Sequence, residues 1–283
     1  MKTEYVVDTH LHLWGLTVSD YVWLPPDGPL HTTFTAGQAR SALDAAGVDT
    51  AVLVQAEDSE ADTEFMFAQA DRHDWIVGVV GWVRLDDPET AERQLDRWQR
   101  EPAFRGVRHL VHDDPRDDFL ELPGVRRSLA LLADRGLPFD VPDAWPRHLA
   151  RAADLAAALP ELTVVIDHLG KPPRDPEAFA AWLATMREVA NRPNTVAKLS
   201  GRQLPGAPVT RETVRPAVEA ALDLFGPDRL MYGGDWPMTV PFGRYGHAWE
   251  ILSTLIGELS WPERSRVLSG TAKAVYGVPE CVR

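Results

Sequence analysis

Residues 5–12 read Tyr-Val-Val-Asp-Thr-His-Leu-His, and the fold assignment starts from this stretch. Its apolar first half is typical of a buried strand, and its second half places two histidines at the end of that strand. Side chains two apart on a strand point to the same face, so His10 and His12 can converge on one point. Two imidazoles so placed suit a divalent metal ion, or a polar substrate without a metal. A packing role explains this pattern equally well when nothing else supports it.

Short apolar segments rich in β-branched residues alternate along the chain with amphipathic stretches rich in alanine, leucine and arginine. This alternation is typical of βα units and a parallel sheet. The expected strands are Tyr5–Leu11, Thr50–Gln55, Trp75–Val83, Gly106–Val111, Leu137–Val141, Leu162–Asp167, Thr195–Leu199 and Arg229–Tyr232. The expected helices include Gly124–Arg135, Pro146–Leu159, Pro176–Asn191 and a final helix over Pro262–Tyr276.

The connections between these elements are unequal in length. Segments that follow strands are long and rich in Pro, Gly, Trp and Asp, whereas segments that lead into strands are brief. In a barrel enzyme the loops that follow the strands build the active site. We therefore expect residues 1–283 to form a single (β/α)₈ TIM-barrel domain. The competing fold is a doubly wound open sheet, but neither G-x-G-x-x-G nor a P-loop follows the first strand.

The composition is that of a soluble globular protein, with 45% hydrophobic and 25% charged residues. A formal net charge of −13 disfavours nucleic acid and anionic membranes as partners. The single cysteine, Cys281, allows no internal disulfide and suits a reducing cytosol. The longest apolar run, residues 75–83, is far shorter than the roughly 20 residues that span a bilayer. We expect a cytoplasmic monomer or homo-oligomer that binds a small molecule.

Two later strand ends carry further polar groups that match the histidine pair. Asp167-His168 follows one apolar strand, and Gly233-Gly234-Asp235 follows the last one. A carboxylate at this position can accept a proton from an attacking water, although an aspartate before Trp-Pro can also simply begin a turn. We predict that His10, His12, His168 and Asp235 form one polar centre, in which Asp235 and His168 are catalytic.

Other polar or aromatic residues at the strand ends are candidates for substrate binding, since arginine forks suit carboxylate or carbonyl oxygens. These candidates are Arg108, His109, Asp140, Lys171, Arg202 and Trp236. Lys198, inside the seventh strand, is a further cationic candidate. Loop salt bridges are an equally good explanation for any one of the cations. Five histidines are assigned no role: His31, His73, His112, His148 and His247. The sequence does not indicate nucleophilic serine or cysteine catalysis, because it has no G-x-S-x-G motif and its single cysteine is Cys281.

Taken in order, five motifs resemble a known family. They are Asp8-Thr9-His10-Leu11-His12, Gly106-Val107-Arg108-His109, Asp167-His168-Leu169-Gly170-Lys171-Pro172, Lys198-Leu199-Ser200-Gly201 and Gly234-Asp235-Trp236-Pro237. Together they resemble the amidohydrolase-related (amidohydrolase 2) family, in particular its sugar lactonases of the L-fuconolactonase and L-rhamnonolactonase type. The resemblance spans nearly the whole chain.

The resemblance implies an amidohydrolase-type barrel, a metal-dependent hydrolase fold, that opens a sugar-derived lactone with water activated by Asp235 and the histidines. It also implies a metal site of His10, His12, His168 and Asp235, with one divalent ion, zinc or manganese; some relatives work without metal. Arg108 stands near the place where other branches carry a metal-bridging lysine, so we expect no two-metal centre.

Two other functions remain open at this stage. One is decarboxylation of an aromatic or unsaturated carboxylic acid, a reaction of another branch of the same superfamily. That branch typically carries a glycine run after the sixth-strand histidine, where this chain has Leu169-Gly170-Lys171-Pro172. The other is a catalytically silent barrel that only binds a metabolite, which a lactone assay with a pH indicator distinguishes because binding alone releases no acid.

Overall fold

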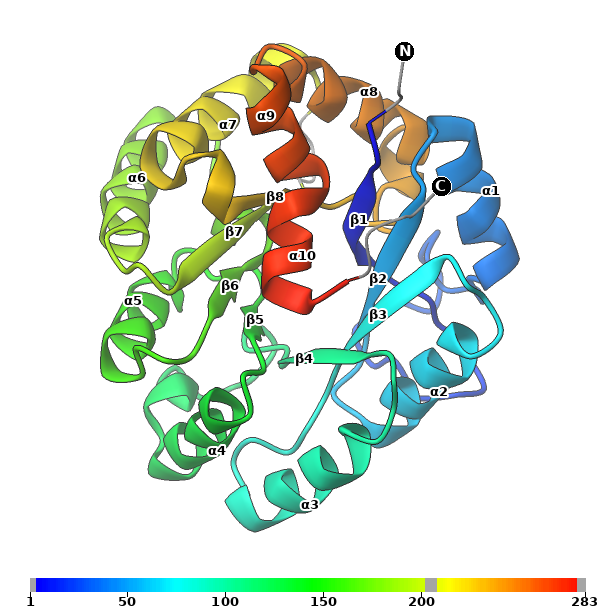
Figure 1. Cartoon of the computed structure of the whole chain (residues 1–283), viewed down its shortest axis with the longest axis vertical. Helices are drawn as coiled ribbons and strands as arrows, with labels where there is room; N and C mark the ends of the chain where they lie inside the picture. Colours follow the sequence, from blue (N-terminus) through cyan, green and yellow to red (C-terminus); the bar gives the residue numbers. More distant parts are fainter. Residues whose placement is uncertain (1–3, 202–207, 279–283) are drawn as a thin grey trace.

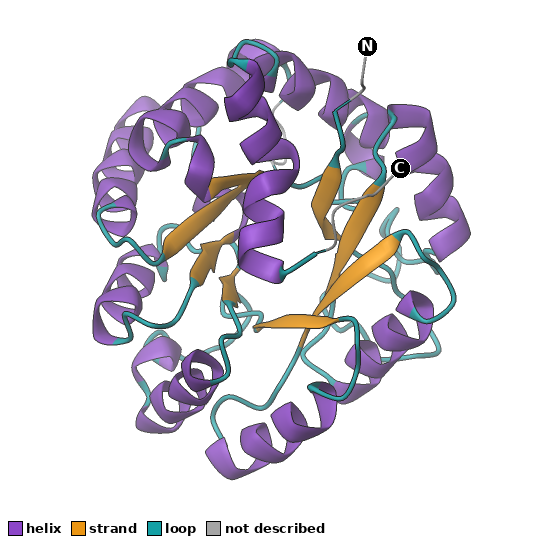
Figure 2. Cartoon of the chain, in the orientation of Figure 1, coloured by secondary structure: helices purple, strands orange, loops and turns teal. Residues whose placement is uncertain are grey.

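The computed structural model describes residues 4–201 and 208–278, which contain eight parallel strands in one sheet, in the order β1 to β8 (Figure 1). The strands are β1 (Val7–Leu11), β2 (Thr50–Val54), β3 (Ile76–Gly81), β4 (Phe104–Arg108), β5 (Phe139–Val141), β6 (Val164–Ile166), β7 (Thr195–Leu199) and β8 (Leu230–Tyr232). Helices surround the strands on the outside (Figure 2). The expected (β/α)₈ barrel is confirmed.

The helices that follow the strands form the outer layer. They are α1 (Ala36–Ala46), α2 (Glu60–Ala70), α3 (Pro88–Trp98), α4 (Pro123–Asp134), α5 (Leu149–Ala158), α6 (Pro176–Ala190), α7 (Arg211–Phe225) and α8 (Arg244–Ile256). The start of several helices is fixed by a side chain that accepts the N–H group three residues later, which satisfies a donor that the helix itself cannot. These capping residues are Thr35, Ser59, Asp87, Asp175 and Thr210.

The C-terminal segment crosses the barrel in Figure 1 and packs against residues inside it. It consists of α9 (Trp261–Ser265), a π-helical turn (Arg266–Gly270) and α10 (Thr271–Tyr276), which follow one another without a break, so the predicted final helix over Pro262–Tyr276 is present with a π-helical turn inside it. Ala272 and Tyr276 of α10 pack among inward-facing strand residues. These strand residues are Val7, Val52, Val54, Val80, Val165, Val196 and Met231. The barrel interior is therefore a packed core that α10 completes.

The barrel closes between β8 and β1, through backbone groups just past the end of β8. The Asp235 N–H donates to the His10 carbonyl at 2.7 Å, and the His12 N–H donates to the Trp236 carbonyl at 2.7 Å. The Asp8 side chain adds a third link, because its Oδ1 accepts the N–H groups of His10 at 2.9 Å and Gly234 at 2.7 Å. Burial raises the pKa of the Asp8 carboxyl to about 7, against the lowering effect of these two N–H groups.

The two glycines before Asp235 are required by close packing at this junction. A Cβ on Gly233 would lie 2.7 Å from the His10 Cβ, and one on Gly234 would lie 2.4 Å from Asp8 Oδ2. Both distances are too short for any side chain. The sequence Gly233-Gly234 therefore lets β8 approach β1 closely enough for the backbone hydrogen bonds to form.

The fourth strand ends earlier than the sequence predicts. We expect Gly106–Val111, but β4 spans Phe104–Arg108. Beyond Arg108 the Leu110 N–H donates to the Asp58 carboxylate, at 3.0 and 3.3 Å, instead of to a neighbouring strand. The chain therefore leaves the sheet directly after Arg108.

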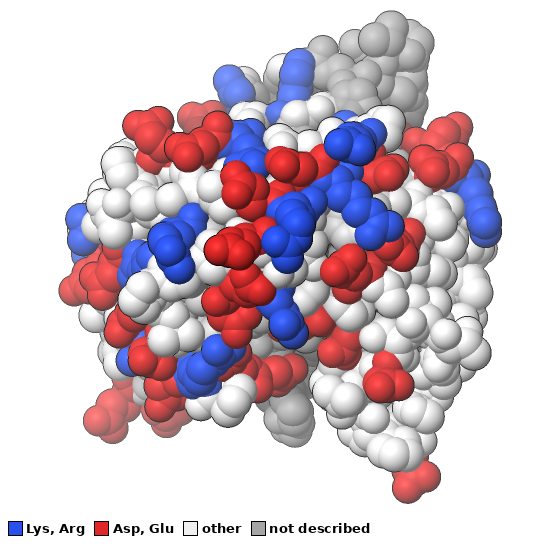
Figure 3. Space-filling model, turned by 90° about the horizontal axis from the view of Figure 1, so that it is seen from below, with Lys and Arg blue, Asp and Glu red and all other residues white. Residues whose placement is uncertain are grey.

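The surface carries both signs of charge. Figure 3 shows one face on which lysines and arginines are interspersed with aspartates and glutamates. Among the described residues, the helices are all too short or too polar to cross a lipid bilayer.

The close packing at Gly234 predicts a stability effect. Gly234→Ala should lower the free energy of unfolding by about 1–3 kcal/mol, because the new Cβ would lie 2.2 Å from the Tyr245 ring. Gly246→Ala is the control, since its Cβ meets no heavy atom within 4 Å and alanine favours the helix by up to about 1 kcal/mol. Urea unfolding measures both. Equal unfolding midpoints for the two variants would contradict the packing argument.

Candidate active site

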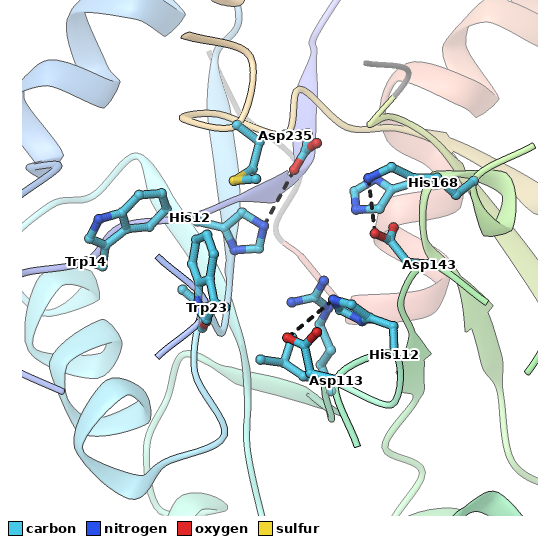
Figure 4. A pocket seen from close by; sticks show the side chains of 13 residues that line it. His12, Trp14, Trp23, His112, Asp113, Asp143, His168 and Asp235 are labelled. Atoms are coloured by element: carbon cyan, nitrogen blue, oxygen red, sulfur yellow. Dashed lines mark hydrogen bonds and ion pairs between the residues drawn. The ribbon is translucent and has the colours of Figure 1, made fainter. Parts of the chain in front are cut away.

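A cavity of about 280 Å³ opens where the strands end (Figure 4). Its wall comes from the end of β4 and from the loops after β1, β2, β4, β5, β6 and β8. Five residues predicted from the sequence line it: His12, Arg108, His168, Lys171 and Asp235. The long loops that follow the strands therefore do enclose a cavity, as expected for this fold.

His10, His12 and Asp235 converge beside this cavity. The two Nε2 atoms of the histidines lie 3.1 Å apart. Asp235 Oδ1 lies 3.6 Å from His12 Nε2 and 4.0 Å from His10 Nε2. All three side chains are buried. Their positions follow from the barrel closure, because the backbones of the same three residues form the hydrogen bonds between β1 and β8.

The Nδ1 atoms of these histidines are held by the barrel. His12 Nδ1 donates to the Val54 carbonyl at 2.8 Å, which leaves its Nε2 with a lone pair. His10 Nδ1 lies 3.2 Å from Asp167 Oδ1 and 3.2 Å from Lys198 Nζ. When His10 Nδ1 donates to Asp167, both Nε2 lone pairs face one point, where they repel each other unless a cation lies between them.

These donor atoms fit a divalent metal ion. A metal-bound histidine usually donates its other ring N–H to a carboxylate or a backbone carbonyl; His12 donates to the Val54 carbonyl, and His10 Nδ1 lies beside Asp167 Oδ1. The candidate ligand atoms of His10, His12 and Asp235 lie within 4.8 Å of one another. His168 belongs to a second such group, with His10 and Asp167. Among the described residues, the four predicted ligands therefore fall into two overlapping groups that share His10.

A buried set of charges lies beneath the histidines. Lys198 Nζ lies 2.6 Å from Asp140 Oδ2 and 3.0 Å from Asp167 Oδ1, and Arg108 Nε donates to Asp167 Oδ2 at 3.0 Å. The Tyr276 hydroxyl of α10 donates to the Asp140 carboxylate, with its oxygen 2.8 and 2.9 Å from the two carboxylate oxygens. Two cations thus face two carboxylates, which is the pairing that buried charges need.

The protonation of these groups follows from their surroundings. Burial alone would raise the pKa of Asp167, but Lys198, His10 and Arg108 hold it well below its ordinary value. Burial raises the pKa of Asp140 to about 6, although Lys198 opposes this shift. Burial also lowers the pKa of His10 well below its ordinary value. His10 is therefore neutral at pH 7, the form in which an imidazole binds a metal.

His168 is held next to His10 by an unusual local backbone. Its φ of 56° lies in the left-handed region, which non-glycine residues rarely adopt. The rings of His168 and His10 meet edge to face, with centroids 4.4 Å apart. His168 Nδ1 lies 2.9 Å from Ser200 Oγ. A Cβ at Gly201 would lie 2.1 Å from His168 Nδ1, so the glycine that follows Ser200 makes room for the ring.

Three of the predicted substrate-binding residues do not line the cavity. His109 lies beyond the end of β4 and stacks on Phe119, with ring centroids 4.2 Å apart. Asp140 is fully buried, with its carboxylate bonded to Lys198 and Tyr276. Trp236 contributes its backbone to the barrel closure, and its ring is buried against the loop after β1. Arg202 lies outside the described residues.

Three polar residues of the cavity wall are not predicted as site residues from the sequence. His112 and Asp113 come from the loop after β4, and Asp143 comes from the loop after β5. His112 is assigned no role from the sequence, yet it faces the cavity in Figure 4. The sequence feature that could have identified them is their position, because each residue follows a strand end by only a few residues.

The comparisons with known proteins agree with this geometry. The chain belongs to the amidohydrolase family, whose sequence profile matches residues 7–278. It is 32% identical to an L-fucono-1,5-lactonase of Burkholderia ambifaria, over 97% of this chain and 93% of that protein. An L-fucono-1,5-lactonase of Burkholderia multivorans is 31% identical, over 97% of this chain and 96% of that protein.

A solved structure is similar over the same length. It is the crystal structure of an amidohydrolase from Burkholderia multivorans with bound zinc, which superposes with a TM-score of 0.88 at 30% identity. The superposition covers 97% of this chain and 100% of that chain. The family resemblance expected from the five sequence motifs is confirmed.

The buried charge set predicts a strong effect of Lys198 on stability. Lys198→Met leaves Asp140 and Asp167 with less positive charge nearby, and we expect the free energy of unfolding to fall by about 3–5 kcal/mol. Lys273→Met, at an exposed position of α10, is the matched control and should change it by less than about 1 kcal/mol. Urea unfolding would contradict the argument if Lys198→Met were as stable as the control.

Proposed function

We propose that the protein hydrolyses a lactone, so that water opens the cyclic ester to a hydroxy acid. The observation that carries the proposal is the position of Asp235, whose carboxylate lies 3.6 Å from His12 Nε2 and lines the cavity. The relatives named L-fucono-1,5-lactonase support a sugar-derived lactone as the substrate. The cytoplasmic location and the monomeric or homo-oligomeric state stay predictions.

In the proposed mechanism Asp235 is the general base. Its carboxylate takes a proton from water as the water oxygen bonds to the carbonyl carbon of the lactone. Arg108 and His168, which line the cavity, stabilise the negative charge that develops on the carbonyl oxygen. The bond from the carbonyl carbon to the ring oxygen then breaks, and the ring oxygen takes the proton from Asp235. The product is the open hydroxy acid.

Neighbouring groups orient the two residues that stabilise this charge. Arg108 has five N–H groups, of which Nε donates to Asp167 and one on Nη1 donates to the Gln55 carbonyl. These two bonds fix the plane of the guanidinium. In the mechanism the Ser200 hydroxyl donates to His168 Nδ1, so His168 Nε2 carries the proton that it offers to the substrate.

The residues present suit one divalent ion, zinc or manganese. His10, His12 and Asp235 would hold it, with His168 beside them, and three protein ligands are typical of a catalytic zinc site. Bound there, a divalent ion supplies a Lewis acid that lowers the pKa of water toward about 7. The zinc in the related Burkholderia multivorans structure supports this assignment. Catalysis by the same side chains without a metal is the alternative.

Replacement of the general base tests the proposed function. Asp235→Asn should lower kcat for lactone hydrolysis by about 10²- to 10⁴-fold, because the amide cannot accept the proton from water. A pH indicator follows acid release, and circular dichroism checks the fold. Asp223→Asn, at an exposed position of α7, is the control and should keep full activity. Near-normal hydrolysis by Asp235→Asn would remove Asp235 from this role.

Zinc content tests the metal site separately. Protein loaded with zinc and then dialysed should retain about one ion per chain. His12→Ala should lose this zinc because it removes one ligand, whereas His31→Ala, at an exposed position of the loop after β1, should retain it. Elemental analysis measures both. If wild type and His12→Ala hold the same amount of zinc, the ion binds elsewhere; full turnover after chelation would favour the metal-free alternative.

A further inference from the structure

Two polar residues that the mechanism does not use form an ion pair on the wall of the cavity. Asp143 follows β5 and Lys171 follows β6, and Lys171 Nζ donates to Asp143 Oδ2 at 3.1 Å. Both residues have a positive φ, 43° for Asp143 and 62° for Lys171. Left-handed backbone at two non-glycine residues is costly and is concentrated at functional sites. Both residues line the cavity, and Figure 4 shows Asp143 on its wall.

The same part of the wall has unused hydrogen-bonding capacity. Asp143 Oδ1 and His112 Nδ1 are buried and have no hydrogen-bond partner within residues 4–201 and 208–278. Buried polar atoms without partners are rare in folded proteins, and those on the wall of a cavity are candidates for ligand binding. Burial lowers the pKa of His112, and the negative charge of Asp143 opposes this shift, so the two residues interact electrostatically. They therefore belong to one cluster with Lys171.

The charges on the wall indicate what this cluster binds. Within the described residues, the two arginine or lysine side chains that line the cavity, Arg108 and Lys171, are each paired with an aspartate. Asp113, Asp143 and Asp235 also line it. A substrate carboxylate would meet these aspartates without an uncommitted lysine or arginine of the described wall. A hydroxyl group fits better, because it can donate to Asp143 and accept from Lys171 at the same time.

The remaining wall suits the apolar face of a ring. Trp14, Trp23, Leu110 and Met238 line the cavity, and Figure 4 shows the two tryptophans on the side away from Asp143. Their rings meet edge to face, with centroids 5.4 Å apart. Trp14 is fully buried, so Trp23 is the ring that offers rigid apolar surface to the C–H groups of a sugar-like ring. The cavity is thus polar on one side and apolar on the other.

We propose that Asp143, Lys171 and His112 form a subsite that binds ring hydroxyl groups, and that this subsite selects uncharged, polyhydroxylated lactones over unsubstituted or carboxylated ones. This inference rests on the proposed lactonase function, and it adds His112 and Asp143 to the residues that contact the substrate.

The test compares two six-membered lactones that differ in their hydroxyl groups. L-fucono-1,5-lactone carries hydroxyls on the ring, and δ-valerolactone carries none. Wild type should prefer the hydroxylated lactone. Asp143→Ala should lower kcat/KM for L-fucono-1,5-lactone by about 10- to 100-fold, mostly through KM, because the hydrogen bond from a substrate hydroxyl to the charged Asp143 carboxylate is lost. Asp143→Ala should therefore also reduce the preference for L-fucono-1,5-lactone over δ-valerolactone.

Matched variants make the result specific. Asp117→Ala, at an exposed aspartate in the loop after β4, should keep the wild-type preference. If Asp143→Ala does not fold, the nearly isosteric Asp143→Asn and His112→Ala take its place, and each should also reduce the preference. A lactone that carries a ring carboxylate should be hydrolysed about 100-fold less efficiently by wild type, because the aspartates of the cavity wall repel the carboxylate.

The outcomes separate this inference from the proposed function. A wild type that hydrolyses none of the lactones would overturn both. A wild type that is active, together with an Asp143→Ala variant that loses activity equally on both six-membered lactones or on neither, would overturn the hydroxyl subsite and leave the lactonase function intact. A wild-type preference for the carboxylated lactone would also overturn the subsite.

Discussion

The closure of the barrel between β8 and β1 is the constraint on which the centre depends. The residues that close the barrel through their backbones are the same residues that carry the proposed chemistry on their side chains. Asp235 and His12 donate their N–H groups across the junction, and His10 accepts one of these bonds. A shift of β8 against β1 would therefore move the base away from both imidazoles. Asp8 and the two glycines before Asp235 leave little room for such a shift.

A second level of organisation lies beneath the centre, where two cations and two carboxylates are buried together. Lys198 connects Asp140 to Asp167 and also reaches His10, so the polar groups form one continuous network within the barrel. The Tyr276 hydroxyl ties this network to the C-terminal helix. Such a network specifies one arrangement of its members, because any unpaired charge in this interior would be costly. The orientation of His10 is thereby set from within the barrel.

The sequence predicts the barrel well, because the periodic strands and the long strand-end loops are local signals. It also predicts that His10, His12 and Asp235 meet, since each stands at a strand end. It fails where the outcome depends on which way a side chain turns. Asp140 lies in β5 as expected, but its side chain points into the barrel, where Lys198 donates to its carboxylate. His112 lies in an irregular loop whose path no periodicity encodes, and the early end of β4 depends on a distant carboxylate, Asp58.

The central claim is that these side chains direct one water molecule at the carbonyl carbon of a lactone. Hydrolysis in H₂¹⁸O with mass spectrometry of the hydroxy acid tests this claim most directly. We expect one solvent oxygen in the new carboxylate and none in the hydroxyl group released from the ring. Label in that hydroxyl group, or release of carbon dioxide in place of a hydroxy acid, would contradict it.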